Sequence, residues 1–112
     1  MNFDKIECNK RQNSFLKQLD LADSSIRRYR DALKSPFLTG LVMQEFRKDS
    51  IFYITDIEKL WKFYSMINLH PANIRMHRYY SAPLMKYISF LNGGKKYGRR
   101  IDFQKKREKR SL

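Results

Sequence analysis

The spacing of the apolar residues is the feature of this sequence that most restricts its fold. From residue 14 to residue 92, large apolar side chains recur three or four positions apart, as on one face of an α-helix. The alternating pattern of a half-buried β-strand never continues beyond a few residues. Ser50–Ile54 could form a brief extended connector, but one such segment cannot build a sheet. The sequence therefore predicts an all-α fold, a small bundle of four to five short helices.

Capping residues and helix breakers set the expected helix boundaries. Ser35-Pro36 combines a good N-cap with a proline at the first helical position, and Thr55 and Glu58 have the spacing of a capping box. The predicted helices run near Ser14–Leu21, from Asp23-Ser24 to about Lys34, from Ser35-Pro36 to about Lys48, from the capping box to before His70-Pro71, and from near Ser81 to Asn92-Gly93, with a loop from Asn68 to about Arg78. Their apolar stripes predict a shared core of Tyr29, Leu33, Leu60, Trp61, Tyr64, Leu84, Tyr87 and Ile88.

Much of the positive charge lies after Gly93-Gly94. Nine of the residues from 95 to 112 are Lys or Arg and two are acidic, so this stretch carries +7 of a net charge of +13. Like charges repel and their hydrated head groups resist burial, so a packed core has little use for such a run. We therefore expect an N-terminal arm at 1–13, a helical domain at 14–92 and a basic tail at 93–112.

The basic tail is typical of an arm that binds a polyanion, because neutralising phosphates releases condensed counterions. The helical domain is also basic, so both parts attract anions. We expect nucleic acid as the partner, duplex DNA rather than RNA. No apolar run approaches the roughly 20 residues that span a bilayer, and no strongly amphipathic helix has a Trp/Phe-rich outer face to anchor it, so we expect no membrane partner. A tail that only keeps the protein soluble is the alternative interpretation.

Three groups of cations are candidate DNA-binding residues. Arg27, Arg30 and Lys34 share a helix face at i, i+3 and i+7, with Arg28 alongside. The alternative is a solvated face with an Arg27–Asp31 pair. The second group, in the expected loop, is Arg75 and Arg78, beside His77, Tyr79 and Tyr80, where the alternative is tyrosines that cover the core and arginines that are solvated. The third group, in the tail, is Lys95, Lys96, Arg99, Arg100, Lys105, Lys106 and Arg107, of which Gly98-Arg99-Arg100 is typical of a minor-groove arm.

Catalytic, metal and cofactor sites are not expected. Helix capping explains Asp56 and Glu58, and His70 precedes a proline in the expected loop. The single cysteine, Cys8, has no partner for a disulfide and no Cys or His pair nearby for a metal set, which fits a reducing compartment. The first residues lack the apolar segment of a signal peptide, so we expect a cytoplasmic protein.

Two segments resemble the N-terminal SAM-like, or core-binding, domain of phage integrases and other tyrosine recombinases. They are Ser24–Leu33 (SSIRRYRDAL) and Tyr80–Leu91 (YSAPLMKYISFL), while Tyr53–Asp56 with Leu60 resembles small helical domains attached to restriction-type nucleases. The resemblance implies a helical bundle that clamps duplex DNA during recombination while a separate domain does the chemistry. The recombinase motif H-x-x-R is absent, since neither histidine has an arginine three residues on. It therefore implies a non-catalytic DNA-binding module, either freestanding or part of a larger recombinase or nuclease assembly.

A protein-interaction adaptor, or an RNA-associated structural protein, is the alternative function. In that case the basic tail would dock on an acidic partner or an RNA-rich assembly. The two functions differ in what the folded part displays. Arg27, Arg30, Lys34, Arg75 and Arg78 on one surface with the tail would favour duplex binding, whereas an exposed apolar patch would favour the adaptor.

Overall fold

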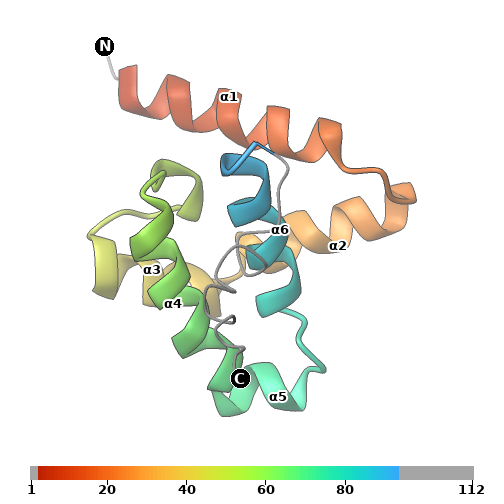
Figure 1. Ribbon diagram of the computed structural model, residues 1–112, viewed down its shortest axis with the longest axis vertical. Helices are drawn as coiled ribbons and strands as arrows, with labels where there is room; N and C mark the ends of the chain where they lie inside the picture. Colours follow the sequence, from red (N-terminus) through yellow and green to blue (C-terminus); the bar gives the residue numbers. More distant parts are fainter. Residues whose placement is uncertain (1–2, 94–112) are drawn as a thin grey trace, which may run out of the picture.

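The computed structural model describes residues 3–93, which fold into six α-helices and one turn of 3₁₀-helix (Figure 1). In chain order the elements are α1 (Phe3–Gln18), α2 (Asp23–Leu33), α3 (Pro36–Phe46), η1 (Ile51–Tyr53), α4 (Ile57–Leu69), α5 (Pro71–Arg75) and α6 (Ser81–Leu91). No strand occurs within residues 3–93, so the prediction of a small all-α bundle is confirmed. None of the helices in this range is long and apolar enough to cross a membrane.

Helix α6 packs against both α2 and α4, and α1 runs along η1 (Figure 1). The core is centred on three buried rings, from Phe15 of α1, Phe52 of η1 and Tyr87 of α6. The Tyr87 ring centroid lies 5.6 Å from that of Phe15 and 5.1 Å from that of Phe52, both nearly edge-on. Such pairs contribute about 0.5–1.5 kcal/mol each beyond the burial of their area. The Tyr87 hydroxyl donates to the Ile54 carbonyl at 2.8 Å, so it is buried with a hydrogen-bond partner.

Five of the eight predicted core residues are buried, Trp61 and Tyr64 of α4 are only partly buried against the core, and the buried Phe63 was missed. Five predicted side chains are buried: Leu33, Leu60, Leu84, Tyr87 and Ile88. Trp61 and Tyr64 are instead half-buried and stack on each other, with centroids 5.2 Å apart. The buried stripe of α4 is Leu60, Phe63 and Ile67. Tyr29 is also only half-buried. The sequence offered two overlapping apolar stripes on α4, and packing against α6 selects the one that contains Phe63.

Helix α1 begins at Phe3 and not near Ser14, so the expected N-terminal arm is wrong for residues 3–13. Cys8 on this helix is buried, and the Arg11 guanidinium donates to the Phe52 carbonyl at 2.6 Å. These contacts hold α1 against η1. The inner face of α1 includes a polar residue, Arg11, which is why no apolar stripe was visible in the sequence.

Three local predictions are also corrected. The segment expected to be extended after Ser50 is η1, and the Ser50 hydroxyl accepts from the amide of Phe52. Helix α4 is capped by Asp56, whose carboxylate accepts from the amide of Lys59 at 3.1 Å, and not by a Thr55 capping box. The expected loop before α6 contains α5. By contrast, the Ser35 cap of α3 is confirmed, since its hydroxyl accepts from the amide of Leu38.

Candidate nucleic-acid interface

Helix α2 presents a row of cations on its outer face. Ile26 and Leu33 turn toward the bundle, and Arg27, Arg28 and Lys34 are exposed on the opposite side. Arg30 lies at the edge of this face and contacts Asp31, with Nη2 3.3 Å from Oδ1. The expected alternative pair, Arg27–Asp31, is therefore replaced by Arg30–Asp31. An exposed ion pair of this kind stabilises the folded protein by at most about 1 kcal/mol.

The exposed cations of α2 keep their charge available to a ligand. Among residues 3–93, no ion pair involves Arg27, Arg28 or Lys34. Lys34 is also the C-cap residue of α2, where the negative end of the helix dipole favours a cation. The outer face of α2 can therefore approach a phosphate without first breaking an internal salt bridge.

The second basic segment forms a tight corner between α5 and α6, residues 71–80, which we term the α5–α6 corner. Its centre is Asn73, which is fully buried. The Asn73 side-chain oxygen accepts from the amides of Tyr80 and Ser81, at 3.1 and 3.0 Å. Its side-chain nitrogen donates to the Ser81 hydroxyl at 3.0 Å and to the Asn68 carbonyl at 3.4 Å. Because Tyr80 provides no side-chain cap, Asn73 serves as the cap of α6 from another helix.

Two non-glycine residues in the corner adopt left-handed backbone angles. The φ angle of His77 is +53° and that of Arg78 is +66°. Each such residue costs about 1–3 kcal/mol and persists only where the surrounding structure fixes it, and strained residues of this kind cluster at functional sites. The Arg78 amide donates to the Asn73 carbonyl at 2.9 Å, and the Arg78 guanidinium donates to the Asn68 side chain at 2.9 Å. Arg78 is therefore held in one orientation at the surface.

Tyr79 shows that the corner and α2 are neighbours. Its pKa is raised above the ordinary tyrosine value, first by partial burial and then by the charge of Asp31, whereas the charge of Arg28 lowers it. Charges shift a pKa in this way only when the groups lie close together. Together with the packing of α2 against α6, this places Asp31 and Arg28 of α2 on the Tyr79 side of the corner, whose Arg75 and Arg78 are exposed. No contact of this kind joins the corner to Arg27, Arg30 or Lys34 in the described part of the chain.

The aromatic residues beside these cations help to build the corner. Tyr80 packs on Phe37, with ring centroids 4.4 Å apart, and Phe37 also meets the His70 ring at 4.9 Å. His70 caps α5, because its Nδ1 accepts from the amide of Ala72 at 3.0 Å. The Tyr80 ring therefore covers the core, as in the alternative interpretation of this segment, while the arginines are exposed.

The corner and the adjoining end of α4 also expose apolar side chains, which the sequence did not indicate. Leu69, Ile74 and Met76 are 74%, 59% and 48% exposed. Ile74 lines a shallow hollow of about 350 Å³ together with Asn68, His77 and Arg78. The corner is therefore mixed in character, with cations and apolar groups side by side.

One sequence signal for this surface was missed. No Asp or Glu lies between Glu58 and Asp102, so α5, α6 and nearly all of α4 carry cations alone. The predicted tail residues from Lys95 to Arg107 lie outside the described residues. Within residues 3–93, no group of three or more His, Cys, Asp or Glu side chains is placed to hold a metal ion.

Comparisons of the chain with protein-family models, with curated proteins and with solved structures find no match. The resemblance to integrase core-binding domains therefore stays a prediction.

Proposed function

We propose that this protein is a non-catalytic module that binds nucleic acid, duplex DNA in preference to RNA. The observation that carries the proposal is the position of Arg28 on α2 beside Tyr79 of the α5–α6 corner. Two basic segments that are far apart in the sequence thus adjoin at one surface. The buried Asn73 fixes the backbone of the corner, and the Arg78 guanidinium is held by the Asn68 side chain, so Arg78 loses little freedom on binding.

The distribution of charge supports the same proposal. The chain has a net charge of +13, and the acid-free stretch after Glu58 includes the corner. An excess of cations attracts the phosphate backbone from a distance and gains from counterion release, although Asp31 also lies beside Tyr79. The resemblance of Ser24–Leu33 and Tyr80–Leu91 to integrase core-binding domains further suggests a recombinase or nuclease assembly in which another component supplies the chemistry.

The test is a titration of the full chain with duplex DNA, single-stranded DNA and RNA at two salt concentrations. The variant Arg28→Ala/Arg75→Ala should weaken duplex binding and reduce the slope of log K against log salt by about 2, since each phosphate contact contributes roughly 0.9. A matched control is Lys10→Ala/Lys17→Ala, which removes the same charge from exposed positions on α1. Equal losses in the two variants would show that only net charge matters and would contradict the interface.

A protein-interaction adaptor is a second candidate function. The exposed apolar side chains of Leu69, Ile74 and Met76 favour it, because apolar patches at the surface mark interaction sites. In this function the basic tail would dock on an acidic partner. Failure of all three nucleic acids to bind in the titration would place the adaptor first.

A further inference from the structure

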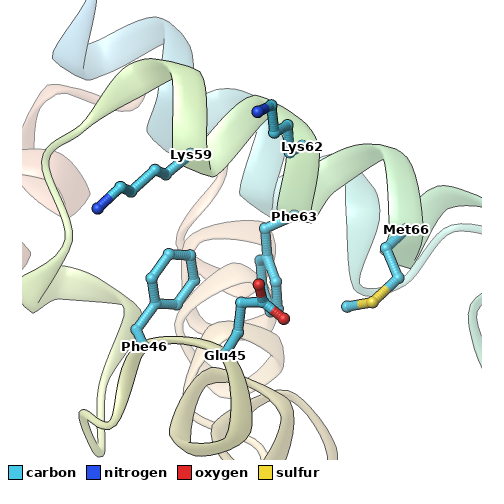
Figure 2. A pocket seen from close by; sticks show the side chains of 6 residues that line it. All are labelled: Glu45, Phe46, Lys59, Lys62, Phe63 and Met66. Atoms are coloured by element: carbon cyan, nitrogen blue, oxygen red, sulfur yellow. The ribbon is translucent and has the colours of Figure 1, made fainter.

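A groove between α3 and α4 forms a site separate from the α5–α6 corner (Figure 2). It has a volume of about 450 Å³ and is lined by Glu45, Phe46, Lys59, Lys62, Phe63 and Met66. The Phe46 and Phe63 rings meet nearly edge-on, with centroids 5.3 Å apart. Phe63 is buried, Phe46 is half-buried and Met66 is 42% exposed. The groove therefore has an aromatic floor with a flexible thioether at one end.

The apolar part of the groove continues along α4 from Met66 to Leu69. Lys59, Lys62, Met66 and Leu69 are spaced i, i+3, i+7 and i+10, so they follow one face of the helix, and all four are exposed. The lysines lie toward the start of α4 and the apolar pair toward its end. Methionine is unbranched and adapts its shape to a partner, which makes it frequent at protein-binding surfaces.

The charges around the groove indicate what it accepts. In the described part of the chain, the side chains of Lys59 and Lys62 on the α4 side form no ion pair, and neither does Glu45 on the α3 side. In Figure 2 the Lys59 side chain extends from α4 toward the Phe46 side, Lys62 points away from the two rings, and Glu45 comes from the opposite side. A phosphate backbone suits this groove poorly, because Glu45 repels it and the aromatic floor offers it no donor. The lysines equally disfavour a basic segment such as the chain's own tail.

We infer that this groove binds a segment of a partner protein that carries one large apolar side chain flanked by Asp or Glu. The apolar side chain packs on Phe46, Phe63 and Met66, and the carboxylates pair with Lys59 and Lys62. Glu45 disfavours acidic residues on the α3 side and so sets the orientation of the segment. The inference rests on the adaptor, the second candidate function, and it is independent of nucleic-acid binding at the corner.

The experiment measures binding of two fluorescein-labelled peptides to the full chain by anisotropy. Both are 13 residues long, with Asp or Glu on each side of a central position that is Phe in one peptide and Ser in the other. The basic tail attracts both peptides equally, so the ratio of their affinities reports the groove. We expect the Phe peptide to bind about tenfold more tightly, a difference of about 1.4 kcal/mol. Equal affinities would overturn the inference.

Variants then locate the binding. Met66→Glu should abolish the preference for the Phe peptide. Lys59→Glu/Lys62→Glu should weaken binding of the Phe peptide far more than Lys10→Glu/Lys17→Glu, which changes the net charge by the same amount on α1. All four lysines and Met66 are exposed, so folding should survive, and far-UV circular dichroism checks this. The same variants are titrated with duplex DNA. If the Lys59/Lys62 variant loses DNA binding and keeps the peptide preference, the groove belongs to the nucleic-acid surface and the inference is wrong.

Discussion

Asn73 is the residue on which the α5–α6 corner depends. It is fully buried, and its oxygen accepts from two backbone amides that start α6. An unpaired buried donor costs about 1–3 kcal/mol, so Asn73→Ala should lower the free energy of unfolding by about 2–4 kcal/mol. Urea unfolding measures this. The matched control is Asn68→Ala, which removes only a surface hydrogen bond to Arg78 and should cost below about 1 kcal/mol. Equal losses would show that the Asn73 hydrogen bonds do not support the corner.

Tyr87 gives the core a pH dependence. Burial raises its pKa well above the ordinary value of 10.0, and the nearby Arg11 only partly opposes this. The unfolded chain therefore loses the phenolic proton at a lower pH than the folded chain. The stability that the raised pKa of Tyr87 gives to the folded state is fully present below pH 10. It is lost progressively above pH 10, by up to about 1.4 kcal/mol per pH unit.

Comparison of the wild type with Tyr87→Phe isolates this effect from other groups that titrate near pH 10. The variant should be less stable at neutral pH by about 0.5–1.5 kcal/mol, because the hydrogen bond to the Ile54 carbonyl is lost. Above pH 10 the stabilities of the two proteins should converge. Tyr64→Phe serves as the control, since Tyr64 is half-buried at the surface of α4. Parallel stability curves up to pH 12 would be inconsistent with a raised Tyr87 pKa.

At the scale of the elements, the sequence predicted helix boundaries best where a capping residue directly precedes an apolar stripe. Helices α2, α3, α4 and α6 begin and end within about two residues of the predicted positions. Helix α1 could not be predicted before Ser14, because its inner face includes Arg11, whose role depends on a carbonyl 41 residues away. The five residues of α5 are too few for a periodic pattern.

The candidate site was predictable in composition but not in arrangement. The cations of α2 and of the corner stand out as charges in the sequence. The position of Arg28 beside Tyr79, however, depends on how α2 and α6 pack. The role of Asn73 could not be predicted either. A polar residue in an expected loop gives no sign that it is buried and caps another helix.

Removal of residues 1–13 tests whether α1 is an integral element. An arm would be dispensable, whereas the structure places Cys8 in the core and joins Arg11 to the Phe52 carbonyl. The truncation should lower the free energy of unfolding by about 2–4 kcal/mol, from one lost charged hydrogen bond and newly exposed apolar area. Thermal and urea unfolding measure the loss, and Arg11→Ala alone should reproduce part of it. A truncated protein as stable as the full chain would mean that α1 is an arm after all.

At the scale of the whole molecule, the question is how the tail and the folded part share an anionic partner. Residues 95–112 carry nine cations, and the folded part adds those of α2 and the corner. If about half of the tail cations contact phosphates, deletion of residues 95–112 should flatten the salt slope for duplex binding by about 3 to 5 units. Affinity should fall for all sequences alike, because phosphate contacts position a protein without reading bases.

Arg27→Ala or Arg30→Ala should act more on sequence preference, if α2 enters a groove. The affinity for duplex DNA is measured at several salt concentrations for the full chain and for the chain without residues 95–112. The difference in slope decides between the two functions. An unchanged slope would mean that the tail does not contact nucleic acid, and the adaptor would then be the leading function.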